Sequence, residues 1–102
     1  MMETNSGLAT GQKVVLKKHV KVREEKRGTA IFDTTNEKVY VINETGGSIV
    51  RLVTSGKTIG ETVSTLAKEY QCEEEAIRND VVGFVEELLS KSLMIKLASG
   101  EN

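Results

Sequence analysis

The sequence lacks the features that identify membrane, secreted and disulfide-bonded proteins. No apolar run reaches the about 18 residues that a membrane-spanning helix needs. The N-terminal segment MMETNSGLATGQ is polar, without the basic and then apolar order of a secretory signal. A single cysteine permits no internal disulfide. We therefore expect a protein without a membrane span and without an export signal, located in the cytoplasm.

Residues suited to catalysis or metal binding are also scarce. His19 is the only histidine, and the only cysteine, Cys72, is far from it in the sequence, so no metal site is expected. The pair Gly46 and Gly47 follows a strand-like run, but neither a P-loop nor a dinucleotide-binding glycine pattern surrounds it. Asp80 has no partner carboxylate at a spacing that would form an acid–base pair. We expect no cofactor and no enzymatic activity.

What is present is the composition of one small folded domain. The chain has 102 residues, of which 38% are hydrophobic and 28% are charged. This length supports a single hydrophobic core but not two. We assign residues 13–97 to the domain, and we expect residues 1–12 and 98–102 to be disordered tails.

Three β-prone runs occupy the first part of this domain. Val20 and Val22 alternate with charged residues, which is the period of a half-buried strand. Residues 29–33 form a second run, and residues 38–43 form a third. In the third run, residues 39–42 are all apolar or aromatic, although an antiparallel strand with one solvated face should alternate. We therefore expect the third strand to bind something along its edge or on both of its faces.

The hydrophobic period then changes to that of helices. A first helix follows the third strand, with Asn43 or Thr45 as its N-cap and Gly56 in a left-handed conformation at its end. A second helix begins at Thr58 and Glu61, which have the spacing of a capping box. We expect the second helix to have a length of about three turns.

The third helix carries more apolar residues than a small domain needs on one helix. We expect Glu73 to be its N-cap, with Cys72 and Ile77 forming a buried hydrophobic staple around that cap. The stripe that we assign to the core consists of Ile77, Val81, Phe84 and Leu88. A second stripe beside it consists of Val82, Val85 and Leu89. This second stripe is available for a partner or for internal packing.

The order of elements predicts the fold class. Residues 93–97 form a last β-prone run after the third helix. We predict an α+β fold that is winged helix-turn-helix-like, with a three-stranded antiparallel sheet followed by three helices and a short C-terminal strand.

Charge is unevenly distributed along the chain. Residues 13–27 contain seven lysines or arginines and two glutamates, whereas the whole chain has a net charge of −1. The segment is either a solvated strand with its lead-in or a surface for an acidic partner. The sequence argues against DNA binding through the third helix, because residues 73–75 at its start are glutamates that would face phosphates. A winged-helix nucleic-acid-binding or regulatory module remains the alternative function.

Recognition of a polypeptide fits the remaining features better. A peptide can add as a strand along the third strand, with main-chain hydrogen bonds supplying affinity. Its side chains would then enter a groove bordered by Val82, Val85 and Leu89. The other interpretation is that both apolar stripes pack inside the domain or in a homodimer.

An ordered set of residues in this chain resembles the PqqD-like family. The matching positions are Asn43, Thr45, Ile49, Leu52, Gly56, Thr58, Tyr70, Asp80, Val81, Phe84 and Leu88. The resemblance covers about residues 20–97 and implies a recognition element that binds the leader of a ribosomally made precursor peptide. It implies a radical SAM or other peptide-modifying enzyme as partner, in pyrroloquinoline quinone synthesis or a related pathway. The peptide-binding residues that it implies are Lys38, Val39, Tyr40, Val41, Ile42, Val82, Val85 and Leu89.

Overall fold

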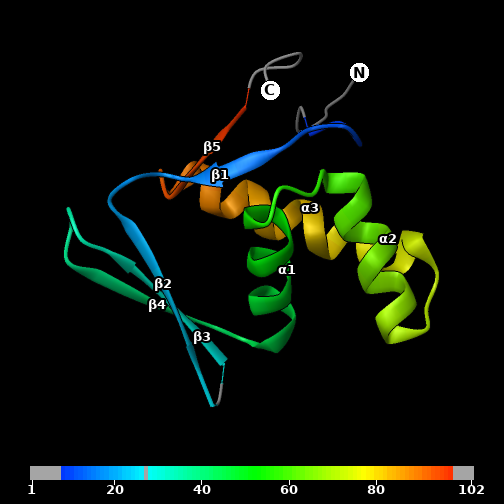
Figure 1. Cartoon of the computed structure of the whole chain (residues 1–102), viewed down its shortest axis with the longest axis horizontal. Coiled ribbons are helices and arrows are strands. Elements are labelled where there is room, and N and C mark those ends of the chain that lie inside the picture. Colours follow the sequence, from blue (N-terminus) through cyan, green and yellow to red (C-terminus); the bar gives the residue numbers. More distant parts are fainter. Residues whose placement is uncertain (1–7, 27, 98–102) are drawn as a thin grey trace.

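The computed structural model describes residues 8–26 and 28–97, in which five strands and three helices follow one another (Figure 1). The elements are β1 (Val14–Leu16), β2 (Val20–Glu25), β3 (Gly28–Asp33), β4 (Lys38–Ile42), α1 (Glu44–Thr54), α2 (Ile59–Tyr70), α3 (Glu74–Ser90) and β5 (Met94–Lys96). The predicted α+β class is confirmed, with three antiparallel strands, three helices and a C-terminal strand.

The main sheet has the strand order β2-β3-β4, and all of its pairs are antiparallel. Tyr40 of β4 lies opposite Ile31 of β3, which in turn lies opposite Val22 of β2. Because β3 is central, β2 and β4 are the two edge strands. The third predicted strand is thus an edge strand, as peptide addition requires.

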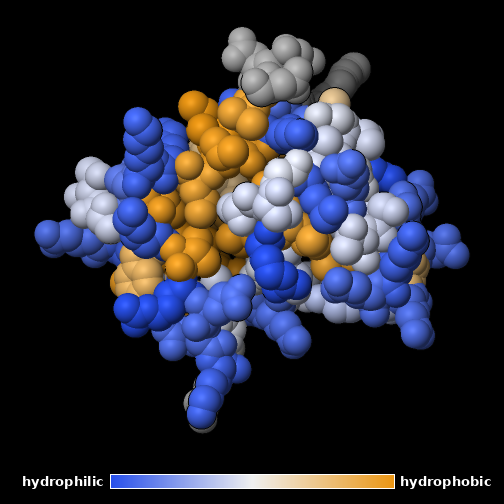
Figure 2. Space-filling model, viewed as in Figure 1, coloured by the Kyte–Doolittle hydropathy of each residue, from blue (hydrophilic) through white to orange (hydrophobic). Residues whose placement is uncertain are grey.

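The sequence interpretation missed β1, which pairs with β5 in a separate two-stranded sheet (Figure 1). Val15 lies opposite Ile95 in this pair. Three residues show no periodicity, and their partner strand comes from the other end of the chain, so no local signal marks them. The space-filling view shows an apolar area over this strand pair (Figure 2). Surplus apolar surface is therefore not confined to β4 and α3.

Side-chain caps fix the starts of the first two helices. The Asn43 side chain accepts a hydrogen bond from the Gly46 backbone N–H at 2.8 Å. In α2 the Thr58 hydroxyl accepts from the Glu61 N–H at 3.1 Å, and the Glu61 carboxylate accepts from the Thr58 N–H at 2.9 Å. The predicted capping box is confirmed, and Asn43 rather than Thr45 caps α1.

The predicted staple at the start of α3 is wrong in one respect. Glu73 is the N-cap, but Cys72 is exposed and does not form part of the core. The preceding residue, Gln71, ends α2 in a left-handed conformation with φ 55°. This turn directs the Cys72 side chain to solvent, so only Ile77 of the expected pair is buried.

The core lies where the three helices meet the inner face of the sheet and the β1–β5 pair. Its fully buried side chains include Ile31, Ile49, Val53, Ile59, Val63, Leu66, Val81, Val85 and Leu93. These residues come from β3, all three helices and the segment before β5, so one core joins every layer of the domain.

The predicted N-terminal tail is partly ordered. The Ile59 N–H donates to the Gln12 carbonyl at 2.8 Å, and the Gly60 N–H donates to the Thr10 carbonyl at 2.8 Å. Leu8 also packs against the core. Residues 8–12 therefore cover the start of α2, because its unpaired helical N–H groups need acceptors. Residues 1–7 and 98–102 lie outside the described part of the chain.

In residues 8–26 and 28–97, none of the helices has the length and apolar character needed to cross a bilayer.

Candidate functional site

The two faces of β4 have different surroundings. Tyr40 and Ile42 are half-buried and pack against the core, whereas Val39 is 56% and Val41 is 83% exposed on the opposite face. The run that looked apolar on both faces therefore does alternate in burial. Among the described residues β4 pairs only with β3, so its other edge has no strand beside it. Such an edge presents free N–H and C=O groups to a further strand.

The residues of α3 that were predicted to border this strand are placed differently. Val85 is 0% exposed and belongs to the core, so the prediction that it lines a surface groove is wrong. The two stripes overlap at this position, since Val85 follows Val81 at four residues and precedes Leu88 at three. The pattern alone did not decide whether Phe84 or Val85 is the residue buried there.

Val82 and Leu89 are half-buried on the flank of α3 that does not face β4. With 3.6 residues per turn, they lie about 160° and 140° around the helix from Phe84. Phe84 is the α3 residue near β4, because a Cβ at Gly46 would meet both Phe84 and the Ile42 side chain. Of the α3 residues predicted to bind a peptide, Val82 and Leu89 thus lie on the other flank of the helix from Phe84, and their role in binding stays a prediction.

A second contact joins the end of α3 to β4. The Lys91 ammonium group lies 5.9 Å from the centre of the Tyr40 ring, which is a cation–π distance. Near the other end of β4, a cavity of about 260 Å³ opens between the start of α1 and α3. Asp80 and Phe84 line its α3 wall. We use "β4 edge surface" for the free edge of β4 together with Tyr40, Ile42, Phe84 and Lys91.

A sequence signal for the α3 part of this surface did exist. Asp80, Phe84 and Lys91 are four and seven residues apart, so they share one side of a helix. The signal was missed because a charged residue, an aromatic residue and another charged residue do not form an apolar stripe. Only the tertiary structure shows that Phe84 lies near Ile42, that Lys91 lies near the Tyr40 ring, and that Asp80 lines the adjacent cavity.

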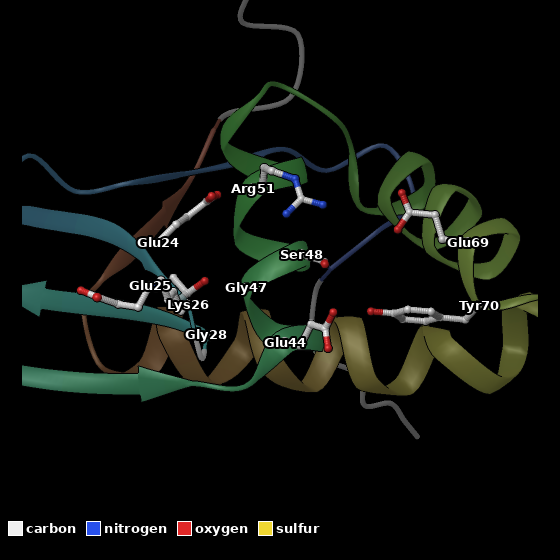
Figure 3. Close-up of a pocket in the computed structure, with 11 residues that line it drawn as sticks. Glu24, Glu25, Lys26, Gly28, Glu44, Gly47, Ser48, Arg51, Glu69 and Tyr70 are labelled. Atoms are coloured by element: carbon white, nitrogen blue, oxygen red, sulfur yellow. The ribbon is translucent and has the colours of Figure 1, made fainter.

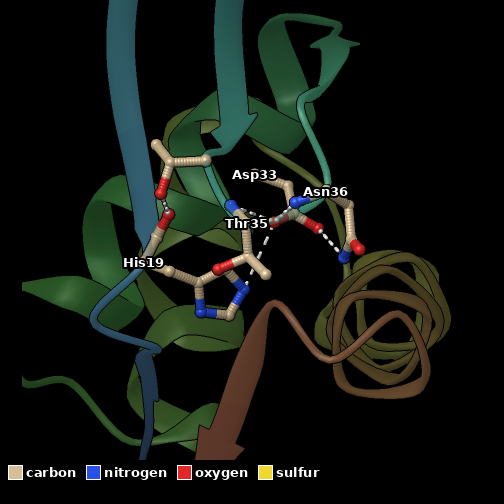
Figure 4. A network of polar contacts seen from close by, with 5 residues as sticks. His19, Asp33, Thr35 and Asn36 are labelled. Atoms are coloured by element: carbon tan, nitrogen blue, oxygen red, sulfur yellow. Dashed lines mark hydrogen bonds and ion pairs between the residues drawn. The ribbon is translucent and has the colours of Figure 1, made fainter.

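A polar network holds the chain where it enters β4 (Figure 4). The Asp33 carboxylate accepts hydrogen bonds from the Asn36 backbone N–H at 3.1 Å, the Asn36 side-chain amide at 2.9 Å and the Thr35 N–H at 3.2 Å. His19 Nε2 lies 3.4 Å from the same carboxylate. These contacts close the turn between β3 and β4, and they give His19 a structural environment.

The same contacts shift the protonation of Asp33, which is only 2% exposed. Hydrogen bonds from the Asn36 side chain and backbone hold the pKa of Asp33 below its usual range, against the opposite effect of burial. The electrostatic interaction with the nearby His19 also lowers the pKa of Asp33. Asp33 is therefore ionised in the folded protein at neutral pH.

The basic segment lies on β1, β2 and the residues around them. Arg23 lies over the Phe32 ring at 5.6 Å and 3.8 Å from the Glu25 carboxylate. Arg23 thus interacts with groups of the domain itself, which accounts for part of the positive charge of the segment. In the described part of the chain, no three His, Cys, Asp or Glu side chains are grouped so that they could hold a metal ion.

Comparison with solved structures defines the class of fold. The lasso peptide synthetase B1 complexed with the leader peptide matches with a TM-score of 0.76 at 19% identity, over 81% of this chain and 98% of that chain. TbiB1 in complex with the TbiA(beta) leader peptide matches with a TM-score of 0.73 at 18% identity, over 86% and 98%. The PqqD truncation of Methylobacterium extorquens PqqCD, a stand-alone RiPP recognition element, matches with a TM-score of 0.74 at 14% identity. This match covers 87% of this chain and 95% of that chain. The chain thus has the fold of the peptide recognition elements.

The family model of coenzyme PQQ synthesis protein D (PqqD) matches residues 28–94. This chain belongs to the PqqD family, as the resemblance of its residues indicated. The PqqA binding protein of Gluconobacter oxydans (strain 621H) is 31% identical over 58 residues, which are 57% of this chain and 60% of that protein. The match thus spans less than two thirds of the length of this relative.

Proposed function

We propose that this protein binds the leader of a ribosomally made precursor peptide and presents it to a modifying enzyme. The observation that carries the proposal is the unpaired edge of β4 beside the half-buried Tyr40, Ile42 and Phe84. An edge strand supplies main-chain donors and acceptors, and the neighbouring side chains supply specificity. The protein needs no catalytic group for this role.

The leader would lie along β4 as a fourth strand of the β2-β3-β4 sheet. Alternate side chains of an added strand point to opposite faces. Those on the inner face would contact Tyr40, Ile42 and Phe84, and the cavity beside Asp80 would accept a side chain near the end of β4. Those on the outer face would lie beside Val39 and Val41, which are exposed. Residues Lys38–Ile42 therefore remain the proposed peptide-binding strand.

Three relationships support this function. The relative from Gluconobacter oxydans is named as a PqqA binding protein, and two of the structural matches hold leader peptides. The third match is a stand-alone recognition element. We extend the role of these proteins to this chain as a non-enzymatic leader-binding protein in the cytoplasm.

The partner enzyme and the pathway follow from the same proposal. A radical SAM enzyme, or another peptide-modifying enzyme, would act on the bound precursor. The pathway is synthesis of pyrroloquinoline quinone or of a related modified peptide.

A titration tests the proposal. The ¹⁵N-labelled protein is mixed with synthetic leader peptides from precursor genes near its own gene, and amide shifts are followed by NMR. We expect saturable shifts in residues Lys38–Ile42 and at Phe84. Shifts confined to residues 13–26, or no saturable shifts with any leader, would overturn the proposed binding mode. The first outcome would favour a module that uses its basic segment.

A further inference from the structure

Charged side chains of opposite sign lie at the two ends of the β4 edge surface. At the end near Ile42, Asp80 lines the cavity of about 260 Å³ together with Asn43 and Phe84. At the other end, Lys38 is the first residue of β4 and is exposed. The surface between these ends is apolar, since Ile42 and Phe84 are half-buried and pack against the core. The β4 edge surface therefore has a negative end and a positive end.

The direction of α3 explains why Asp80 lies at the Ile42 end. Phe84 of α3 lies near the Ile42 side chain, because an added Cβ in the first turn of α1 would meet both. Lys91, later in α3, lies 5.9 Å from the centre of the ring of Tyr40, which comes earlier in β4. The helix thus runs antiparallel to β4. Asp80, one turn before Phe84, is therefore placed at the end of β4 rather than at its start.

The charges at the two ends are not neutralised within the described part of the domain. In residues 8–26 and 28–97, the ion pairs include neither Asp80 nor Lys38. Asp33 lies opposite Lys38 in the β3–β4 register, but the turn that follows Asp33 donates the hydrogen bonds to its carboxylate. Lys91 differs, since its ammonium group lies 3.3 Å from the Glu87 carboxylate. Asp80 and Lys38 are thus the charges that a bound peptide can meet.

A larger cavity on the other side of α1 does not separate its charges in this way (Figure 3). Its volume is about 570 Å³, and its lining includes Glu44, Arg51 and Glu69. Carboxylates and a guanidinium group share one hollow there, so this cavity favours no order of charges. The β4 edge surface instead places the two signs at opposite ends of one strand, beside main-chain groups that a peptide can pair with.

The geometry of an added strand converts these two ends into a sequence pattern. All pairs of the main sheet are antiparallel, so a leader added in the same sense runs opposite to β4. Residues directly opposite each other in such a pair share a face of the sheet. Lys38, Tyr40 and Ile42 lie on one face of the five-residue strand. The first leader residue on this face is then opposite Ile42, the next is opposite Tyr40, and the last is opposite Lys38.

We propose that the protein selects leaders in which a basic residue precedes an acidic residue by four positions, the spacing of Ile42 and Lys38, with an apolar residue midway. The basic side chain lies beside Asp80, and the acidic side chain lies beside Lys38. The apolar side chain contacts Tyr40. This inference rests on the proposed binding of a leader to β4 and adds the charge order and the direction of that leader. A leader parallel to β4 would need the acidic residue first.

Exchange of the two charges on the protein tests the proposed order. The double variant Asp80→Lys/Lys38→Glu reverses both ends and leaves the net charge unchanged. Isothermal titration calorimetry with a leader from a precursor gene near its own gene should show about tenfold weaker binding, because two exposed attractions become repulsions. The double variant Lys21→Glu/Glu24→Lys makes the same exchange on β2, the other edge strand, and should bind as the wild type does. Thermal unfolding verifies that both variants are folded.

Exchange of the charges on the peptide supplies the reciprocal test. A leader whose basic and acidic residues are exchanged should bind the wild type about tenfold more weakly than the natural leader does. The Asp80→Lys/Lys38→Glu variant should bind this exchanged leader more tightly than the wild type does. Damage to the fold cannot produce that gain, so the gain identifies a direct interaction between the paired charges.

The possible outcomes separate this inference from the proposed function. Equal affinity of a leader for the wild type and for Asp80→Lys/Lys38→Glu would overturn the charge order while leaving leader binding intact. Tighter binding of the exchanged leader by the wild type would overturn the proposed direction. A leader that binds along β4 without a basic and an acidic residue at this spacing would also overturn the inference. No binding of any leader to the wild type would overturn both the inference and the proposed function.

Discussion

A Cβ atom at Gly46 would lie 2.9 Å from Cε1 of Phe84, closer than carbon atoms can approach without displacement. The glycine thus allows the first turn of α1 to pack between β4 and α3. The added Cβ atom would also meet the side chain of Ile42. Gly46, around which the sequence shows no phosphate-binding pattern, sets the spacing between the elements that form the β4 edge surface.

Replacement of Gly46 by alanine should destabilise the protein. Alanine is about 1 kcal/mol better than glycine in a helix interior, but the added methyl group displaces Ile42 or Phe84, which costs about 1–3 kcal/mol. We expect a net loss of about 1 kcal/mol in the free energy of unfolding measured with urea.

Gly83→Ala is the matched control, because no atom lies within 4 Å of its added Cβ. It should stabilise α3 by up to about 1 kcal/mol. Equal effects of the two variants would contradict the close approach.

Two valines of α3 should respond differently to the same truncation. Val85→Ala removes two methyl groups from the core and should cost about 2 kcal/mol of unfolding free energy. Val82→Ala should cost less than about 1 kcal/mol, because Val82 is only half-buried. Denaturant unfolding of both variants measures the difference. The opposite order would restore the surface role that the sequence suggested for Val85.

Leader binding should depend on the flank of α3 that faces β4. Phe84→Ala should weaken the affinity for a leader peptide about tenfold, since a half-buried aromatic ring beside the added strand is lost. Leu89→Ala truncates another half-buried residue on the far flank and should leave the affinity nearly unchanged. Isothermal titration calorimetry with one leader measures both, at a temperature where each variant is folded. Weakening by Leu89→Ala alone would support the original sequence assignment.

Acid should destabilise the protein partly through Asp33. Its pKa is lower in the folded protein than the ordinary value of 3.8, so folding favours the ionised form. This contribution is fully present above the ordinary value and is lost as the pH falls through the folded pKa. Glu61 acts in the same sense, because the Thr58 N–H lowers the pKa of its carboxyl.

The variant Asn36→Ala tests the cause of this pH dependence. It removes the hydrogen bond that lowers the pKa of Asp33 most. Urea unfolding between neutral pH and pH about 3 should show a shallower loss of stability in this variant than in the wild type. An unchanged slope would mean that Asn36 does not set the protonation of Asp33.

The buried hydroxyl of Thr62 is an opportunity for stabilisation. Thr62 is 0% exposed, and among the described residues its hydroxyl has no hydrogen-bond partner. Thr62→Val keeps the shape and removes the unsatisfied group, so it should raise the free energy of unfolding by about 1 kcal/mol. Thr65→Val, at a half-buried position of the same helix, should have little effect. A destabilised Thr62→Val variant would indicate a partner for this hydroxyl.

Local features of the fold were predictable because their causes are local. The capping box of Thr58 and Glu61 and the left-handed Gly56 depend on residues within one turn of each other. The three strands of the main sheet follow from short β-prone runs, of which the first also has the period of a half-buried strand. The family resemblance also depends on ordered sequence positions, and it identified the family correctly.

The sequence by itself determined the class of elements, their order and the importance of residues Lys38–Ile42 as an apolar strand. Only the tertiary structure decided that Val85 is buried while Phe84 faces β4, since both residues satisfy the helical period. It also decided the pairing of β1 with β5 and the convergence of Glu44, Arg51 and Glu69 on one cavity. These relationships join residues far apart in the sequence, and helical or strand periodicity contains no information on which elements will meet.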